Sequence, residues 1–242
     1  MNGEHDEVFA ARRDSYEAFV AERVAEVRQR IEHARKRSPF GQSVTLVAVT
    51  KTHSANAVEA AWRAGVADVG ENKVQEAEEK MNVVSVPVRW HLIGHLQRNK
   101  ARSAVRFDLI HSIDSERLAQ AVNDAARAVD KVQDVLVQVN VSGETTKGGF
   151  SPTDVPSFAA TLHAFRNLRV TGVMTMAPFD AAEAELCQVF SGARRVGEQL
   201  LNEGHPAKEL SMGMSGDFEA AIAEGATLVR LGTVLFGNRA SP

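Results

Sequence analysis

Thiols and long apolar runs are scarce in this chain. Its single cysteine, Cys187, excludes an intramolecular disulfide framework and a metal cluster held by cysteines. It falls in a helical pattern, where we expect a small, buried, apolar side chain. No apolar stretch approaches the ~20 residues of a membrane span. Residues 1–14 are charged and lack the apolar core of a secretory signal, so we expect a cytoplasmic protein.

Excess charge is missing as well. The formal net charge is -3 over 242 residues, which gives no reason to expect nucleic acid or a membrane surface as a partner. Hydrophobic residues make up 44% of the chain and charged residues 24%, the balance of an ordinary globular protein. This length permits one large domain or two small ones, and no linker or low-complexity tract divides it.

Apolar runs and helix-compatible segments alternate along the chain. Residues 8–37 repeat apolar side chains at spacings of three and four, which predicts a long helix that ends near Pro39 and Gly41. Eight apolar runs with the character of buried strands follow: 44–50, 66–70, 88–93, 108–113, 134–141, 168–176, 209–212 and 227–231. Each of the first seven precedes a helix-compatible segment, and the eighth leads into a short tail, 233–242.

This alternation predicts the fold class. Strands separated by helices imply a parallel α/β sheet with right-handed crossovers. Eight such strands favour closure into a single (β/α)8 TIM-type barrel over a doubly wound open sheet. We therefore expect one domain over residues 1–242, with a leading helix and linker at 1–41 and the barrel at 42–242.

Lys51 is the most informative candidate for chemistry. It follows directly on the apolar run 44–50, so it would stand at the carboxyl end of a buried strand, where barrel active sites form. Burial disfavours the ammonium form of a lysine, and a neutral amine is the form that attacks a carbonyl to give a Schiff base. The ordinary alternative is a lysine whose stem lies along the strand end and whose head lies in water.

Two loops rich in glycine and hydroxyl groups indicate an anion site. Ser211-Met-Gly-Met-Ser215-Gly follows the seventh run, and Gly232-Thr233 follows the eighth. Glycines let backbone N–H groups approach an anion closely, and hydroxyl groups add donors. Barrels often bind phosphate in the loops after strands seven and eight. Two ordinary turns are the alternative interpretation.

Arg230 and Asn72 complete the candidate site. Arg230 lies inside the last apolar run, where a buried guanidinium needs a partner, either a ligand or a structural ion pair. Asn72 follows the second run and either faces the site or caps the next helix. His91 and His95 have an H-x-x-x-H spacing with no accompanying carboxylate, so we expect no metal site.

Five motifs in fixed order resemble one known family. They are Val-Ala-Val-Thr-Lys51-Thr, Val-Gly-Glu-Asn72-Lys-Val-Gln-Glu, Trp90-His-Leu-Ile-Gly-His-Leu-Gln-Arg-Asn-Lys, Leu-Ser211-Met-Gly-Met-Ser-Gly-Asp and Val-Arg230-Leu-Gly-Thr-Val-Leu-Phe-Gly. Together they span nearly the whole chain, and they resemble the pyridoxal-phosphate homeostasis proteins. That family has a single (β/α)8 barrel similar to the N-terminal domain of alanine racemase.

The resemblance implies a role for each candidate. Lys51 would carry pyridoxal 5'-phosphate as a Schiff base (the internal aldimine). Arg230 would face the pyridine nitrogen, and Asn72 would lie near the ring. The phosphate would be held by hydroxyl and backbone groups of Ser211, Ser215, Gly232 and Thr233.

Three positions depart from the family pattern. His53 stands where a lysine is often found, which puts in doubt any role for a second lysine beside Lys51. Lys73 replaces a frequent aromatic residue, and Gly216 replaces a frequent acidic one. None of these changes removes the features expected to bind the cofactor.

The resemblance favours a carrier over an enzyme. Pyridoxal phosphate drives carbanion chemistry when its ring nitrogen is protonated, usually by a carboxylate partner. An arginine cannot accept that proton, so it favours a neutral ring nitrogen and a weaker electron sink. Racemases with this arginine use a tyrosine from a second domain as another base. The one tyrosine here, Tyr16, is far in sequence from any expected strand end. We therefore expect a protein with no catalytic residue that buffers pyridoxal phosphate or delivers it to apoenzymes that depend on it.

Two other functions stay open. One is a racemase-like enzyme that uses pyridoxal phosphate, with His95 or Lys147 as an unrecognised acid. The other is a cofactor-free Schiff-base aldolase that acts on a phosphorylated sugar. The aldolase would use the same lysine and the same phosphate loops.

Overall fold

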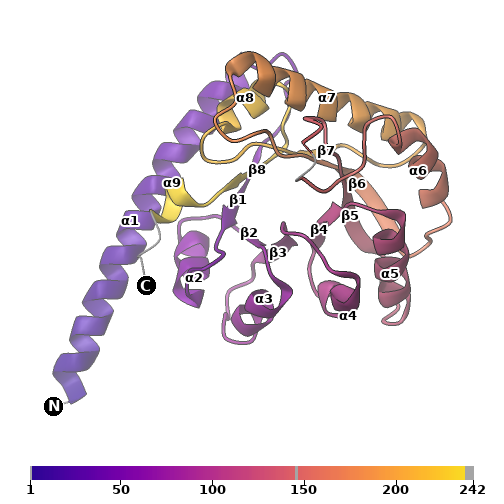
Figure 1. Ribbon diagram of the computed structural model, residues 1–242. Coiled ribbons are helices and arrows are strands. Elements are labelled where there is room, and N and C mark those ends of the chain that lie inside the picture. The colour runs from indigo at the N-terminus through magenta and orange to yellow at the C-terminus, as the bar shows by residue number, and fades with distance from the viewer. Residues whose placement is uncertain (1, 145–146, 238–242) are drawn as a thin grey trace.

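Eight parallel strands close into a barrel in chain order, with β8 paired to β1 (Figure 1). The computed structural model describes residues 2–144 and 147–237. The strands are β1 (Thr45–Val49), β2 (Asp68–Glu71), β3 (Arg89–Leu92), β4 (Leu109–Ile113), β5 (Gln133–Gln138), β6 (Leu168–Met174), β7 (Glu209–Ser211) and β8 (Leu228–Leu231). The prediction of a (β/α)8 barrel is confirmed, and each predicted apolar run coincides with a strand, although strand ends differ by up to three residues.

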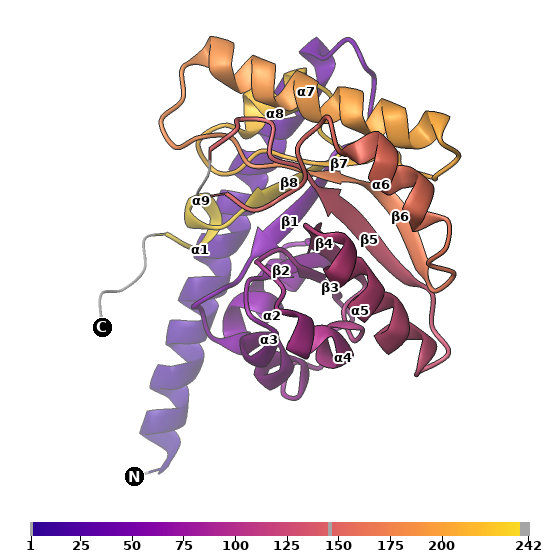
Figure 2. The same ribbon diagram turned by 45° about the vertical axis from the view of Figure 1, so that its right-hand side comes forward.

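Helices surround the strands on the outside of the barrel. They are α2 (Ala55–Arg63), α3 (Val74–Met81), the 3-10 turn η1 (Arg98–Lys100), α4 (Ala101–Ala104), α5 (Glu116–Arg127), α6 (Val155–Leu162), α7 (Glu183–Asn202) and α8 (Phe218–Ala223). In both ribbon views α7 and α8 lie on the side of the barrel opposite α3 and α4 (Figures 1 and 2). The segment expected as a tail begins with a further helix, α9 (Thr233–Phe236), and its residues 238–242 lie outside the described ranges.

The predicted leading helix is α1 (Asn2–Arg37), which packs along α2, α8 and α9 and extends beyond the barrel (Figure 1). Its buried side chains recur at spacings of three and four: Val20, Val24, Val27, Ile31 and Ala34. This stripe is the apolar face that the sequence predicted. Within the described ranges, no helix has both the length and the apolar character needed to cross a membrane.

Side chains inside the barrel form layers. The inner cluster joins five strands through Val47, Leu109, Leu136, Met174 and Leu228. Because side chains alternate between the two faces of a strand, the residue two positions further also points inward. These next inward residues, Val49, Gln138, Met176 and Arg230, line a cavity. The packed layer is thus the floor of the site, and strand register decides which side chains reach it.

Two expectations need correction. Strand β5 ends at Gln138 rather than Val141 because the Asn140 side chain organises the next loop. Its Nδ2 donates to the carbonyls of Glu144 and Lys147 at 2.8 and 3.0 Å. Cys187 does lie in a helix, α7, but it is only partly buried.

Candidate functional site

The carboxyl ends of the strands enclose a cavity of about 1000 Å³. Six of the seven predicted site residues line it: Lys51, Asn72, Ser215, Arg230, Gly232 and Thr233. They come from the ends of β1, β2 and β8 and from the loop after β7, so residues far apart in sequence meet at one rim. The volume is at the upper end of the range for small-molecule sites, which is about 300–1,000 Å³.

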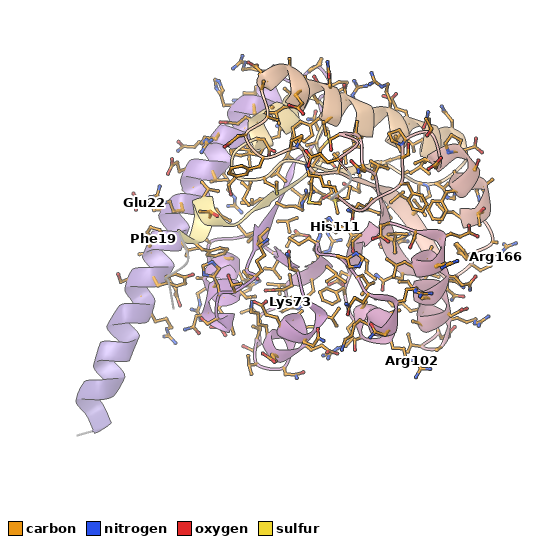
Figure 3. All side chains as sticks on the ribbon, in the orientation of Figure 1. Phe19, Glu22, Lys73, Arg102, His111 and Arg166 are labelled. Carbon is orange, nitrogen blue, oxygen red and sulfur yellow. The ribbon has the colours of Figure 1, made fainter. Side chains whose placement is uncertain are left out.

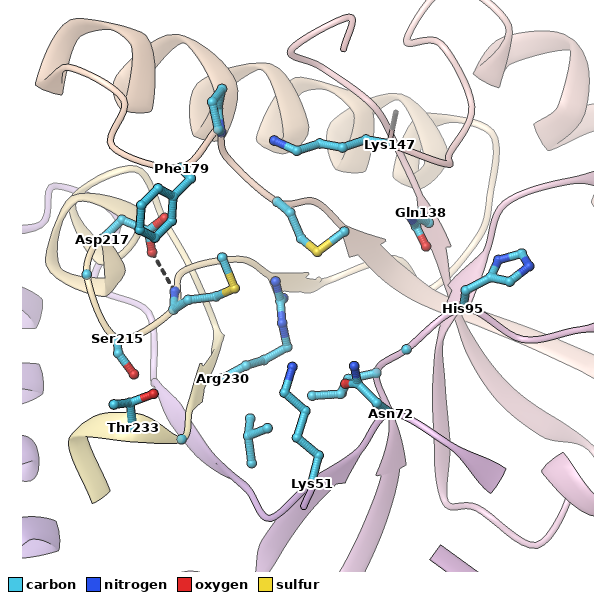
Figure 4. Close-up of a pocket in the computed structure, with 18 of the residues that line it drawn as sticks. Lys51, Asn72, His95, Gln138, Lys147, Phe179, Ser215, Asp217, Arg230 and Thr233 are labelled. Atoms are coloured by element: carbon cyan, nitrogen blue, oxygen red, sulfur yellow. Dashed lines mark hydrogen bonds between the residues drawn. The ribbon is translucent and has the colours of Figure 1, made fainter. Parts of the chain in front are cut away.

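Lys51 leaves β1 through a tight turn. The N–H of His53 donates to the carbonyl of Thr50 at 3.1 Å, and Thr52 has a φ of 66°. Figure 4 shows the Lys51 side chain rising into the cavity between Arg230 and Asn72. Lys51 is partly buried, and its side chain points into the cavity that it lines.

Arg230 is held from beneath. Only 5% of the residue is exposed, and its Nη1 donates to Ser211 Oγ at 2.6 Å while Nη2 donates to the carbonyl of Thr175 at 3.0 Å. Burial lowers the pKa of Arg230 to about 10, and the carboxylate of Asp217 acts in the opposite direction. The guanidinium therefore stays charged near neutral pH. A guanidinium has five N–H donors, so some remain for a ligand in the cavity.

Ser211 lies beneath Arg230 instead of facing the cavity. Its side chain is fully buried, and its Oγ lies 2.8 Å from Nδ1 of His111. The hydroxyl thus has two protein partners, Arg230 and His111. The phosphate role that the resemblance implied for Ser211 has no support in this geometry, because the strand register turns the side chain into the barrel.

A buried polar chain continues from Ser211 across the barrel interior. His111 Nε2 lies 2.9 Å from His91 Nδ1, and His91 Nε2 lies 2.9 Å from Asp68 Oδ1. Figure 3 shows His111 well inside the barrel, whereas Arg102 and Arg166 project from the outside. Burial lowers the pKa of His111 well below its usual value, and the positive charge of Arg230 acts in the same direction.

The chemistry of its two ends orients this chain. A guanidinium can only donate, and an ionised carboxylate can only accept. With neutral imidazoles, each hydrogen bond then points the same way, from Arg230 through Ser211, His111 and His91 to Asp68. The role of His111 was not predicted, although a histidine inside the apolar run 108–113 is a signal of a polar group that needs a buried partner.

The loops after β7 and β8 present unused donors. Within the described residues, the hydroxyls and backbone N–H groups of Ser215 and Thr233 make no hydrogen bond. Figure 4 shows both side chains on the same side of the cavity. A side chain at Gly232 would place its Cβ only 3.2 Å from the carbonyl of Val49, so glycine fits there. Such a set of small groups and free donors can hold an anion.

Asp217 shapes the loop after β7. Its Oδ1 accepts the N–H of Met214 at 2.5 Å, the contact dashed in Figure 4. Burial raises the pKa of Asp217, against the effect of the Met214 hydrogen bond and of Arg230. Gly213, just before this turn, has a φ of 94°, which favours glycine. Asp217 is not distinctive in the sequence, because a carboxylate at the start of a helix is usually a cap.

The outer part of the cavity is polar and more open. His95 Nδ1 lies 3.0 Å from Asp114 Oδ2, and Lys147 Nζ lies 3.1 Å from Glu144 Oε2. His95, Asp114 and Lys147 all line the cavity, and exposed Phe179 stands at its edge. Tyr16 packs on the core from α1 and does not line the cavity.

The residues of the site indicate which class of compound the protein binds. A lysine at the end of the first strand, a buried arginine and free donors after strands seven and eight suit a phosphorylated carbonyl compound. The family model for the alanine racemase N-terminal domain matches residues 23–240. Among similar solved structures, an alanine racemase from Corynebacterium glutamicum shares the fold, with 16% identity, a TM-score of 0.72 and coverage of 92% of this chain and 62% of that one.

Relatives with higher sequence identity identify the family of this chain. The pyridoxal phosphate homeostasis protein of Pseudomonas aeruginosa is 42% identical over 225 residues, which cover 91% of this chain and 96% of that protein. The Escherichia coli K12 protein of the same name is 38% identical over 231 residues, covering 91% and 97%. PipY of Synechococcus elongatus, solved with PLP bound, is 37% identical, with a TM-score of 0.80 and coverage of 90% and 100%. This chain belongs to the family of pyridoxal phosphate homeostasis proteins.

Proposed function

We propose that this protein binds pyridoxal 5'-phosphate at Lys51 and serves in pyridoxal phosphate homeostasis by buffering or delivering the cofactor. The observation that carries the proposal is the convergence of the Lys51 amine, Arg230 and the free donors of Ser215 and Thr233 on one cavity. The proposal includes a cytoplasmic location and transfer to apoenzymes that use the cofactor, which both stay predictions.

The donor set of the cavity fits each part of the cofactor. The amine of Lys51 would add to the aldehyde and water would leave, which gives a Schiff base. The hydroxyls and N–H groups of Ser215 and Thr233 would hold the phosphate, together with the backbone around Gly232, which also lines the cavity. Arg230 would donate to the pyridine nitrogen, and Asn72 would contact the ring from the end of β2.

Arg230 favours a carrier over an enzyme. Bound pyridoxal phosphate serves as an electron sink for carbanions when its ring nitrogen is protonated. A charged guanidinium held by Ser211 and Thr175 donates to that nitrogen and cannot protonate it at neutral pH. In addition, Tyr16 is remote from the cavity, so it cannot supply a second base.

One observation favours a second candidate, a racemase-like enzyme. The His95–Asp114 pair and Lys147 line the same cavity and could exchange a proton with a bound amine. A cofactor-free aldolase would also use Lys51, but it would bind a phosphorylated sugar in place of pyridoxal phosphate.

The test combines spectroscopy with mapping. Incubation with pyridoxal phosphate should give a visible band that borohydride removes, and mass spectrometry of the reduced peptides should place the adduct on Lys51. Lys51→Ala should abolish the adduct. Lys73→Ala, which removes an exposed lysine outside the cavity, should leave it unchanged. An adduct on Lys73 or Lys147 would contradict the assignment, and steady-state turnover of amino acids would favour the racemase-like candidate.

A further inference from the structure

A buried ammonium lies outside the cavity and behind Lys51. Lys80 projects from α3, and only 7% of its side chain is exposed. Its Nζ donates to Glu71 Oε1 at 2.6 Å, to the carbonyl of Thr50 at 2.7 Å and to Glu76 Oε1 at 2.9 Å. An ammonium has three donors, so all of them are used. Lys80 does not line the cavity and has no role in the function proposed above.

The partners of Lys80 hold the residues on both sides of Lys51. On the preceding side, the hydroxyl of Thr50 donates to Glu71 Oε1 at 2.6 Å, and its carbonyl accepts from Lys80. On the following side, the N–H of Thr52 donates to Glu76 Oε1 at 2.5 Å. We call Thr50, Thr52, Glu71, Glu76 and Lys80 the Lys80 cluster.

The Lys80 cluster holds a backbone conformation that needs support. Thr52 has a φ of 66°, in the left-handed region that a β-branched residue rarely adopts. The hydrogen bond from its N–H to Glu76 fixes this conformation directly. If Thr52 relaxed, the chain direction at Lys51 would change, and the amine would leave its place between Arg230 and Asn72.

The charges of the Lys80 cluster depend on one another. Burial raises the pKa of Glu71, although the hydrogen bonds from Lys80 and Thr50 act to lower it. Burial also acts to raise the pKa of Glu76, but hydrogen bonds from Lys80 and from the N–H of Thr52 lower it overall. Lys80 thus acts on both carboxylates in the same direction, toward the ionised form, which accepts hydrogen bonds from Thr50 and Thr52.

The hydrogen bonds of Lys80 are concentrated next to Lys51. Every acceptor of Lys80 outside its own helix belongs to Thr50 or Glu71, at the ends of β1 and β2. Burying an ammonium carries a desolvation cost, and an apolar side chain could pack α3 against the sheet without it. Unlike an apolar side chain, the ammonium donates hydrogen bonds to the carbonyl of Thr50 and to the two carboxylates that hold Thr50 and Thr52.

We propose that Lys80 is a positioning residue that acts through the Lys80 cluster to hold the amine of Lys51 where it can react with a carbonyl in the cavity. This inference rests on the proposed function, because it takes Lys51 as the residue that reacts with pyridoxal phosphate. A purely structural role, attaching α3 to the sheet, would change stability without changing the reactivity of Lys51.

The main variant is the pair Glu71→Gln with Lys80→Met. Removing both charges avoids leaving a lone buried carboxylate, which would endanger folding. The control is Lys131→Met. Lys131 is a partly buried lysine whose Nζ also donates to backbone carbonyls, those of Val105 and Phe107, at 2.7 and 2.8 Å. These two carbonyls precede β4, so the contacts of Lys131 lie at the opposite end of the strands from Lys51. A second test, Glu76→Ala on the partly exposed side of α3, leaves the Glu71–Lys80 pair intact.

Three measurements separate the possibilities. Hydrogen exchange of the peptide covering residues 50–54, without ligand, should become faster in the double variant and in Glu76→Ala. The affinity for pyridoxamine 5'-phosphate, which lacks the aldehyde, should stay within about threefold of the wild type. Formation of the visible adduct with pyridoxal phosphate should slow by about tenfold or more, since misplacing a reacting group by ~1 Å can cost about a hundredfold.

The Lys131→Met control should match the wild type in all three measurements, with neither faster exchange at 50–54 nor slower adduct formation. Adduct formation at the wild-type rate in a folded double variant and in Glu76→Ala, or unchanged exchange at 50–54, would overturn the inference. Absence of any adduct on Lys51 in the wild type would instead refute the proposed function itself, so the two failures are distinguishable.

Discussion

Arg230 rests on Ser211: its Nη1 donates to the serine hydroxyl across 2.6 Å, inside the barrel and beneath the cavity. The same hydroxyl meets His111 at 2.8 Å, so Ser211 joins the site to a buried polar chain that ends at Asp68. Ser211 and Ser215 therefore have different surroundings, although the resemblance implied a phosphate contact for both. Ser211 supports Arg230, whereas Ser215 lines the cavity, where we propose that it binds the phosphate.

Thr233→Ala should weaken binding of pyridoxal phosphate by roughly ten- to hundred-fold. The variant removes one hydrogen bond to a charged group, about 1.5–3 kcal/mol. Binding of pyridoxal, which has no phosphate, should be unchanged, and wild-type protein should bind pyridoxal much more weakly than the phosphorylated form. Fluorescence or absorbance titration measures all four affinities. Equal loss for both ligands would show that Thr233 does not contact the phosphate.

Ser211→Ala should behave differently from Thr233→Ala. Because the Ser211 hydroxyl contacts Arg230 and His111 and not the cavity, its loss should affect the ring end of the ligand. We expect pyridoxal and pyridoxal phosphate to lose affinity by a similar factor. The same titrations check this, and a loss confined to the phosphorylated ligand would return Ser211 to the phosphate site.

The fold was predictable because its signal repeats along the chain. Eight apolar runs with helices between them define a barrel even when single strand ends are off by a few residues, as at Gln138. Lys51 and Arg230 were found for the same reason, since each interrupts or ends an apolar run and so falls on a known face of a strand.

The direction of individual loop side chains was not predictable. Ser211 and Ser215 stand four residues apart in one loop sequence, yet one faces the barrel interior and the other the cavity. Only the end of β7 and the glycine turn at Gly213 separate them. The partners of His111 and Lys80 depend on register between distant strands, which no local pattern encodes.

Acid should destabilise this protein in part through His111. Its pKa is lowered in the folded state by burial and by the positive charge of Arg230. Below about pH 6.5 the unfolded chain therefore binds a proton that the folded protein does not. Above that pH, protonation of His111 does not reduce the free energy of unfolding. As the pH falls below it, the free energy of unfolding decreases by up to about 1.4 kcal/mol per pH unit for one proton.

His111→Gln should flatten this dependence, because an amide does not titrate. Urea unfolding at several pH values between 7.5 and 5, on wild type and variant, measures the difference. His163→Gln serves as the control, since His163 is exposed and distant from the buried chain. Parallel stability curves for wild type and His111→Gln would contradict the assignment.

Arg230→Glu should increase exchange of the α-proton of a bound amino acid. The carboxylate would share a proton with the ring nitrogen of pyridoxal phosphate, whereas the arginine can only donate to it. Arg230→Gln is the matched control, because it removes the charge without supplying a carboxylate. Circular dichroism and thermal unfolding establish that both variants fold, and deuterium incorporation at the α-carbon of alanine, followed by NMR, measures exchange. Faster exchange in Arg230→Glu alone supports the role of Arg230 in suppressing catalysis. A wild type that already racemises alanine at ordinary enzymatic rates, ~1–1000 per second, would overturn the carrier interpretation in favour of the racemase-like one.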